Sequence, residues 1–344
     1  MTELEQPDSV RTPGRTWTEF PEELGGPGRG TVAVTAPGTV EVRAADESDR
    51  FDRIDPEQNT VAARHADDLA AGNAVLVRVP SGVAVEEPVR IATELREGFF
   101  PHHVVVIVED GAAAEVVERN QGSGAVDSSV VEVVVGADAT LRYTKINDLD
   151  DATGYADCHA RVAANGEVRW TVASTGADLY RNTVTTALEG RAARLDYRLG
   201  FLAARDQHLD HTATVVHAAD DTRCDIEARG VALDRSRAVY KGVQEVAEGA
   251  EGTESFQDER TVLVGDDAEA DTTPQLRIDN HDVEATHAAT TGHVDEEDLF
   301  YMRSRGIAES AAKREIITGM FDDLFDAAPA RLAVHRAIDA ALAE

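Results

Sequence analysis

The chain has 344 residues, and its 65 acidic residues against 33 basic ones give a formal net charge of −32 at pH 7. A surplus of this size repels phosphate backbones and anionic lipid headgroups, which excludes nucleic acids and membrane surfaces as favoured partners. Apolar residues still make up 42% of the chain, which is enough for a sizeable core.

The basic residues and the cysteines indicate the setting in which the protein works. Lysine occurs only at Lys145, Lys241 and Lys313, and an acidic, lysine-poor composition predicts adaptation to concentrated salt, where charges are screened within about 3 Å at 1 M. Cys158 and Cys224 have no CxxC spacing, so we expect two small buried residues in a reducing cytoplasm. No leader pattern and no apolar run of about 18 residues is found, and a membrane segment is not expected.

Residues 1–73 predict an acidic N-terminal segment with one short helix. The glycine-rich stretch 25–30 has neither a strand pattern before it nor a helix pattern after it, so a connecting loop is expected rather than a phosphate-binding turn. Thr60 is a suitable N-cap, and apolar positions at four-residue spacing predict a helix that Gly72 ends. His65 would belong to the apolar face of this helix.

From Ala74 the pattern changes to short runs rich in valine and isoleucine between Gly, Asp and Pro, which is typical of strands. The first expected strands are 75–79, 83–85, 89–91 and 104–108. A recurring unit then follows, in which a Gly, Asn or Asp turn precedes alternating small or apolar residues. The copies of this unit begin at Gly111, Gly136, Asn165, Gly190, Asp221, Gly249 and Asp267.

This pattern predicts a mainly β architecture over residues 74–293. Strands and tight turns at an irregular but short period, with almost no helical pattern, indicate a β-solenoid in which each coil stacks on the last. A β-sandwich is the competing architecture, because it also uses many short strands, but a sandwich of this length would be unusually large.

Residues 294–344 predict a small helical domain that closes the solenoid. Asp295 is a suitable N-cap and Gly306 a suitable terminator for a first helix. A second helix carries apolar residues at three- and four-residue spacing from Ile316 to Leu324, and Pro329 ends it before a third helix.

The sequence contains none of the motifs GxxxxGK[ST], GxSxG, HExxH and CxxC, so nucleotide hydrolysis and serine-hydrolase chemistry have no support. Two groups of histidines are candidates for metal binding. In the first group, His208 and His211 would point to opposite faces of a strand, so they could not chelate one ion without a bulge.

The second group is His281, His287 and His293, whose even spacing would place all three on one side of a continuous strand. The residues 288–292 have a turn-like composition, however, and we expect three separate solvent-facing histidines. A neutral imidazole is nevertheless a competent iron ligand where a carboxylate or thiolate lies beside it.

Two long motifs resemble the signature of the SufB/SufD family of iron–sulfur cluster assembly proteins. The motifs are Pro274–Gly292 and Asp298–Ile307, with weaker matches at Val79–Val83, Glu87–Val89 and Tyr240–Gly242. The resemblance extends over about residues 70–325. It implies a right-handed parallel β-helix with flanking helical segments, which agrees with the solenoid inferred from the strand pattern.

The resemblance also implies partners. In this family SufB and SufD join through their β-helices, clusters are built at the junction, and each subunit holds a SufC ABC-type ATPase on its C-terminal helices. The expected partners are therefore a SufC-like ATPase and a SufB-like subunit, or a second copy of this chain where SufB is absent. The chain itself is expected to be a non-catalytic scaffold that carries only a transient iron–sulfur cluster or iron. The residues expected to dock the ATPase are Leu299, Phe300, Tyr301, Arg303 and Arg305.

Two positions favour SufD over SufB within this resemblance. SufB-like members have an essential cysteine where this chain aligns Glu259, and a glutamate where it has Ala288. The resemblance therefore implies a SufD-like chain in which His287 helps to hold iron or the nascent cluster at the junction. Ala285 stands where a cysteine is common in SufD, which removes one soft ligand from the expected site.

Two other functions remain open at this point. A carbohydrate-active β-helix enzyme would use acidic and basic side chains on one face of the solenoid, although only 5% of the residues are aromatic and able to stack on sugars. A SufB-like scaffold that acts alone would be distinguished by stoichiometric binding of iron and sulfide to the isolated chain.

Overall fold

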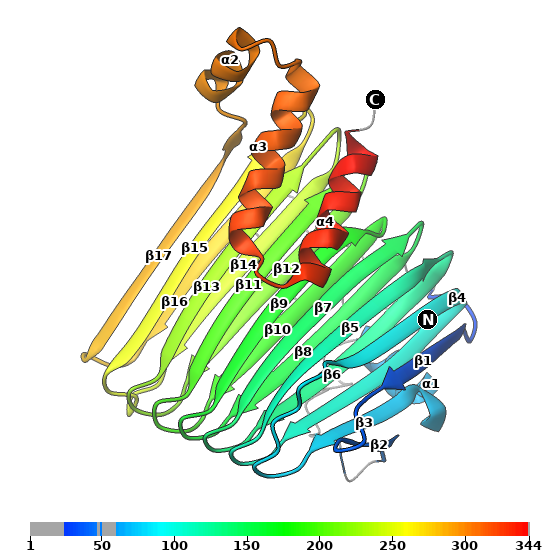
Figure 1. Cartoon of the computed structure of the whole chain (residues 1–344), viewed down its shortest axis with the longest axis vertical. Coiled ribbons are helices and arrows are strands. Elements are labelled where there is room, and N and C mark those ends of the chain that lie inside the picture. The colour runs from blue at the N-terminus through cyan, green and yellow to red at the C-terminus, as the bar shows by residue number, and fades with distance from the viewer. Residues whose placement is uncertain (1–23, 47–48, 50–59, 343–344) are drawn as a thin grey trace.

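The computed structural model describes residues 24–46, 49 and 60–342, and it shows a parallel β-solenoid built from two facing sheets (Figure 1). From β4 onward each strand pairs in parallel with the strand two places along the chain, so that β6 pairs with β8 and β7 with β9. Register partners in neighbouring coils are separated by 26 residues (Thr153 to Leu179) to 32 residues (Arg237 to Glu269). The predicted solenoid is confirmed, and the sandwich alternative is wrong, because consecutive strands lie in opposite sheets instead of forming hairpins.

Each coil contributes one strand to each sheet. Sheet A contains β2 (Glu41–Ala44), β3 (Ala74–Val79), the C-terminal part of β4 (Val89–Val108), β6 (Ala125–Val135), β8 (Thr153–Val162), β10 (Leu179–Leu188), β12 (His208–His217), β14 (Arg237–Val246) and β16 (Glu269–Ile278). Sheet B contains β1 (Arg29–Thr35), the N-terminal part of β4, β5 (Ala113–Ser123), β7 (Thr140–Asp150), β9 (Glu167–Gly176), β11 (Arg194–Ala203), β13 (Arg223–Ala232), β15 (Thr253–Leu263) and β17 (Val283–His293). The helices are α1 (Thr60–Asp68), the 3-10 turn η2 (Ala71–Asn73), α2 (Glu296–Ser304), α3 (Glu309–Leu324) and α4 (Ala328–Ala341).

The first coils differ from the strands predicted for them. The expected strands 89–91 and 104–108 are parts of one long strand, β4, which pairs in sheet B up to Glu97 and in sheet A from Gly98. Gly98 has a φ of 70°, a left-handed conformation that lets the strand turn the corner between the sheets. The expected strand 83–85 is wrong, because only Ala84 forms an isolated bridge, to Ala113.

The corners of the coils explain the recurring turn unit. Non-glycine residues with φ between 49° and 62° occupy both edges of the solenoid, as at Asp138 and Asn165 on one edge and Asp151 and Asp234 on the other. Asp and Asn tolerate this left-handed conformation better than most side chains, which explains their recurrence at the corners. The predicted units at Gly111, Gly136, Asn165, Gly190, Asp221 and Gly249 lie at one edge, whereas the unit at Asp267 lies at the other.

The interior of the solenoid is apolar in part and polar in part. Alternate residues of every strand point inward, and one apolar core runs along most of the coils, with Tyr143 and Trp170 in ring contact at 4.7 Å. Both cysteines are free and fully buried, as predicted. Near the N-terminal end, however, the interior also encloses the charged groups of Glu118 and Lys145, which are fully buried and form an ion pair.

His211, on the inward face of β12, makes stability depend on pH. It stacks on Phe201 at 5.2 Å, its two ring nitrogens have no hydrogen-bond partner among the described residues, and burial lowers its pKa to about 3. Because the unfolded chain regains a histidine pKa near 6.5, stability is greatest above that pH and falls as acidification protonates only the unfolded form. His211→Leu should reduce the slope of stability against pH by about 1.4 kcal/mol per pH unit between about pH 6 and pH 4, measured by urea unfolding of parent and variant. An unchanged slope would contradict a buried neutral imidazole.

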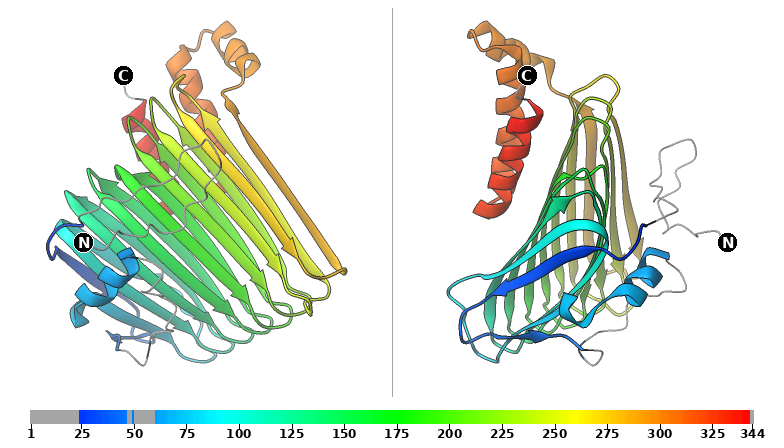
Figure 2. Two further views of the ribbon diagram at one scale, coloured as in Figure 1. Left: turned by 180° about the vertical axis from the view of Figure 1, so that it is seen from behind. Right: turned by 90° about the vertical axis from the view of Figure 1, so that its right-hand side faces the viewer.

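Helices α1, α3 and α4 cover parts of the outer faces of the two sheets (Figure 2). Helix α1 lies on sheet A, where His65 is buried and its Nδ1 lies 2.9 Å from Ser128 Oγ. His65 therefore belongs to the packed face as predicted, but α1 ends at Asp68 and not at Gly72, which lies in η2. The glycine-rich stretch leads into β1 instead of a helix, in agreement with its interpretation as a connection.

Helices α3 and α4 lie against the outer face of sheet B, over β7, β9, β11 and β13. Their buried residues pack on outward-facing apolar side chains of the strands, including Leu202 and Val231. The expectation that the C-terminal helices close the end of the solenoid is therefore wrong: they cover its side. Pro329 lies in the first turn of α4, a position that suits its fixed φ, rather than directly after α3.

Among the described residues, no helix is both long and apolar enough to cross a membrane.

Candidate functional site

The terminal coil, formed by β16 and β17, is the part of the solenoid that holds most of the first resembling motif. In the described part of the chain, β16 pairs only with β14 and β17 only with β15, so each has an open edge. Inward-facing side chains that the next coil would otherwise cover are partly exposed, as for Leu276 (36%) and Ile278 (39%). Open strand edges with exposed apolar side chains are the usual features of a surface that pairs with another chain.

His287 lies on this coil. It is exposed and occupies an inward-facing register position on β17, directly above Gln257 of β15. The turn expected at 288–292 is absent, because β17 pairs continuously with β15 from Val283 to His293. His287 and His293 therefore share a face, but six residues of strand separate them by about 20 Å, so one ion could not bind both.

The remaining histidines form no metal site with three ligands. His281 lies in the turn before β17. On β12, His211 points inward and is buried while His208 points outward, so the prediction that they occupy opposite faces is confirmed. Across residues 24–46, 49 and 60–342, no group of three or more His, Cys, Asp or Glu side chains is arranged to hold a metal ion.

A polar layer lies directly beneath the terminal coil. Five successive inward-facing positions of β15 are polar and at most 3% exposed: Thr253, Ser255, Gln257, Glu259 and Thr261. Only the last inward position, Leu263, is apolar. Sequence reasoning missed Gln257, although its signal was available, because five polar residues at every second position of one strand contrast with the valines and leucines elsewhere in the interior.

Glu259, which the sequence resemblance places at the cysteine position of SufB-like chains, points into this layer. Its carboxylate accepts a hydrogen bond from Thr261 Oγ1, and its second oxygen has no partner among the described residues. Burial raises the pKa of Glu259 to about 7, because the loss of solvent outweighs the hydroxyl groups of Thr261 and Thr272 and the charge of Arg229, which favour the charged form. Perturbed pKa values of this kind cluster at functional sites, which makes Glu259 a candidate site residue.

Helix α2 carries the residues expected to dock a partner, and it stands away from the sheets (Figures 1 and 2). Asp295 caps it by accepting a hydrogen bond from Glu297 N, and Gly306 follows it with a φ of 86°, as predicted. None of its residues is buried. Phe300 is 75% and Tyr301 60% exposed, and large aromatic side chains with this exposure are rare on a surface that contacts only water.

The polar residues of this helix have only local partners. The Arg305 guanidinium lies over the Tyr301 ring at 5.2 Å, and Arg303 forms a surface ion pair with Glu309 at 3.2 Å. Leu299 is partly exposed, and Arg303 and Arg305 are exposed. Four of the five predicted docking residues therefore lie in α2 and the fifth, Arg305, is its C-cap, and none of the five is buried.

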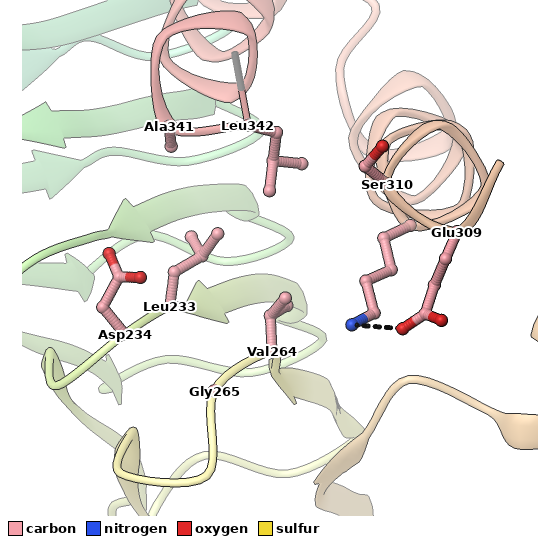
Figure 3. A pocket seen from close by; sticks show the side chains of 9 residues that line it. Leu233, Asp234, Val264, Gly265, Glu309, Ser310, Ala341 and Leu342 are labelled. Atoms are coloured by element: carbon pink, nitrogen blue, oxygen red, sulfur yellow. Dashed lines mark ion pairs between the residues drawn. The ribbon is translucent and has the colours of Figure 1, made fainter. Parts of the chain in front are cut away.

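A hollow of about 290 Å³ separates α3 and α4 from the corners after β13 and β15 (Figure 3). Its lining combines apolar residues such as Leu233, Val264 and Leu342 with the ion pair between Lys313 Nζ and Glu309 at 3.1 Å. No residue that the sequence singled out as a ligand lines it, so the terminal coil remains the candidate site.

Comparisons with known proteins identify relatives over most of the chain. The family model described as "SUF system FeS cluster assembly, SufBD core domain" matches residues 90–320. An iron–sulfur cluster assembly SufBD family protein of Mycobacterium bovis is 32% identical over 263 residues, which are 73% of this chain and 66% of that protein.

Relatives of both named types match equally well. The iron–sulfur cluster assembly protein SufD of Bacillus subtilis is 28% identical over 81% of this chain and 65% of its own length. The assembly protein SufB of the same organism is 28% identical over 82% of this chain and 62% of its own length. The chain thus spans about two thirds of the length of these curated relatives.

Proposed function

Because this chain belongs to the SufBD family of iron–sulfur cluster assembly proteins, we propose that it is a SufD-like scaffold subunit of a SufBCD-type complex. The observation that carries the proposal is the open terminal coil, which presents His287 at the end of the solenoid. Identity does not separate SufB from SufD, so the choice of SufD depends on Glu259 and Ala288, which replace the cysteine and glutamate expected of a SufB-like chain.

The proposed contact with a SufB-like subunit uses the free edge of the terminal coil. An added strand hydrogen-bonds to an exposed edge through backbone groups, and side-chain pockets then select the partner. Strand β17 contains no proline, so each of its residues has the N–H group that such pairing requires. In this arrangement His287 would face the junction and contribute one imidazole to iron or a nascent cluster, which are the cargo of the complex.

The proposed contact with a SufC-like ATPase uses α2. Its exposed aromatic pair, Phe300 and Tyr301, offers apolar area, and Arg303 and Arg305 offer positive charge on an otherwise acidic protein. Aromatic and arginine side chains contribute most strongly to protein–protein contacts. ATP hydrolysis would then be the work of the partner, and this chain would act as a scaffold.

The family match favours this function over the carbohydrate-active enzyme. A cytoplasmic location and a salt-adapted source stay predictions from composition. The SufB-like scaffold acting alone is the remaining alternative, and it differs in requiring no second β-helix subunit.

The test is purification of the tagged chain from the cells that encode it, in concentrated salt. We expect a SufB-like chain and an ABC-type ATPase to co-purify. Phe300→Ser with Tyr301→Ser should remove the ATPase and leave the SufB-like chain bound. An eluate with neither chain would contradict the proposal.

His287→Ala tests the proposed metal role at the contact with the SufB-like subunit. It should leave the composition of the complex unchanged and lower the yield of reconstituted cluster about tenfold or more, because a metal-ligating side chain is lost. His293→Ala, on the same face of β17, is the control and should keep the parent yield. Equal yields from parent and His287→Ala complexes would remove the metal role.

A further inference from the structure

The interior of the first coils encloses four ionisable side chains. Glu118 and Lys145 form an ion pair, and His102 and Asp127 lie beside it, with all four side chains fully buried. Two carboxylates and one lysine leave one negative charge in excess, so the cluster is neutral only when it binds one further proton. Uncompensated charge inside a protein is strongly unfavourable, and His102 is the basic group placed to take this proton.

His102 lies between carboxylates that belong to different sheets. Its Nδ1 is 3.2 Å from Asp127 Oδ1 on β6 of sheet A, and its Nε2 is 3.9 Å from Glu118 Oε1 on β5 of sheet B. A neutral imidazole has one N–H group and one lone pair, so one of the two carboxylates would face a lone pair. A protonated ring has an N–H group on both nitrogens and attracts both carboxylates. The placement of one acid at each ring nitrogen therefore favours the charged form.

The other described groups around His102 offer no substitute for that proton. Lys145 contacts Glu118 and donates to Ser129 Oγ at 3.1 Å. The inward-facing positions of β3 are valines, and Phe100 stacks on the His102 ring at 6.0 Å. The titratable or charged side chains that face this part of the interior are Glu118 on β5, Asp127 on β6, Tyr143 and Lys145 on β7, Cys158 on β8 and Tyr180 on β10.

His211 shows what burial alone does to a histidine in this interior. Loss of solvent is the sole influence on His211, and it lowers the pKa of that ring to about 3. Burial acts in the same direction at His102, but the charges of Asp127 and Glu118 outweigh it, and the pKa of His102 lies above its ordinary value of 6.5. The two histidines therefore affect stability in opposite directions as the pH changes.

We propose that His102 is a proton-dependent bridge that joins Asp127 of sheet A to Glu118 of sheet B, and that loss of its proton loosens the first coils. Deprotonation would leave two enclosed carboxylates against Lys145 alone, and opening of these coils would let water reach the excess charge. The bridge lies at the opposite end of the solenoid from His287, so this regulatory device goes beyond the proposed function and does not depend on it.

Urea unfolding of the full chain between pH 6.5 and pH 8 tests the bridge. Below pH 6.5 the folded and unfolded forms both hold the proton, so the stabilisation is complete there. Above pH 6.5 only the folded form keeps it, and the unfolding constant of the parent should rise by up to about tenfold per pH unit. Asp127→Asn should abolish this rise, because Glu118 and Lys145 then balance each other beside a neutral His102. Asp148→Asn, which removes a surface carboxylate paired with Arg119, is the matched control and should keep the rise.

His102→Gln is the complementary variant. It should unfold more readily than the parent at pH 6.5, and the two unfolding constants should converge as the pH rises, because the parent then loses the charge that the variant lacks. Adding Asp127→Asn to His102→Gln should recover stability, since it removes the excess carboxylate. Where His102→Gln does not fold, Asp127→Asn and Asp148→Asn provide the test. Imidazole ¹⁵N spectra of the parent should show a charged His102 ring at pH 7.

The two buried cysteines report which coils open. Cys158 lies on β8 beside the cluster, and Cys224 lies on β13 in a later coil. Labelling with iodoacetamide at pH 6.5 and pH 8, read for each cysteine by peptide mass spectrometry, gives two rates whose ratio cancels the common effect of pH on thiols. The ratio of Cys158 to Cys224 should rise about threefold or more in the parent and stay constant in Asp127→Asn.

Three results would each overturn the inference: a neutral His102 ring at pH 7, a rise in Asp127→Asn equal to that of the parent, or a labelling ratio in the parent that does not change with pH. Purification of the complex is a separate measurement. Failure of the partners to co-purify would refute the proposed complex and leave the proton-dependent bridge intact.

Discussion

Lys145→Met should lower the free energy of unfolding by about 3–5 kcal/mol, because it leaves the Glu118 carboxylate buried without its counter-charge. Lys145 Nζ contacts Glu118 and donates to Ser129 Oγ at 3.1 Å, and Tyr143 donates its hydroxyl to Glu118 at 2.7 Å. Burial disfavours the charged carboxylate, but Lys145 and His102 outweigh it and hold the pKa of Glu118 below its ordinary value. The nearest remaining basic group is His102 at 3.9 Å, which lies closer to Asp127, at 3.2 Å.

The double variant Lys145→Met with Glu118→Gln separates the lost charge from the lost packing. A neutral amide still accepts the Tyr143 hydrogen bond, so the double variant should recover at least half of the stability lost by Lys145→Met. Arg161→Met is the control, because the Arg161–Glu189 pair is exposed and worth about 1 kcal/mol or less. Urea unfolding at fixed salt measures all three, and equal losses from Lys145→Met and Arg161→Met would show that the buried pair has no special role.

Gly176→Ala should cost at least about 3 kcal/mol of stability, because two independent penalties act at one corner. Gly176 ends β9 with a φ of 93°, a region that side chains with a Cβ rarely adopt. An added Cβ would also lie 1.8 Å from the carbonyl oxygen of Leu149, and that oxygen already accepts a hydrogen bond from Ala177 N at 2.7 Å. Neither the strand nor the preceding coil can move without breaking this corner.

Gly249→Ala is the matched control for this substitution. Gly249 lies in the turn between β14 and β15, and an added Cβ would meet no atom within 4 Å. Its substitution should change stability by about 0.5 kcal/mol or less. Thermal and urea unfolding measure both variants. A loss below about 1 kcal/mol in Gly176→Ala would mean that the corner relaxes.

The solenoid could be predicted from sequence because its signals are local. Turn residues recur at the corners, and alternation along each strand correctly placed His208 and His211 on opposite faces. The continuity of β4 could not be predicted, because the strand changes sheets at Gly98 and its two halves have separate apolar runs. The composition of residues 288–292 predicted a turn. Backbone pairing with β15 instead holds these residues in an extended strand, and composition alone does not report this pairing.

The candidate site was predicted only in its outer part. The family resemblance identified His287 and the residues of α2, but it could not show that Gln257 spans the interior or that Gly242 makes room for it. The position of α3 and α4 was missed for a similar reason. Leu202 and Val231 face outward and are apolar, which indicates a covered outer face. This signal is hard to recognise in the sequence, because inward-facing residues of the same strands are apolar as well.

The helical layer on sheet B affects how the solenoid responds to load. Helices α3 and α4 pack across four successive strands of sheet B, from β7 to β13. The coils that contain β15 and β17 lie beyond most of this helical layer. Coils that have a packed helical layer resist bending more than coils that have none, so bending is expected beyond β13. Helix α2 connects β17, in the uncovered terminal coil, to α3, which packs on the covered coils, so a force on α2 would act on both, and the terminal coil that contains His287 would deform more easily.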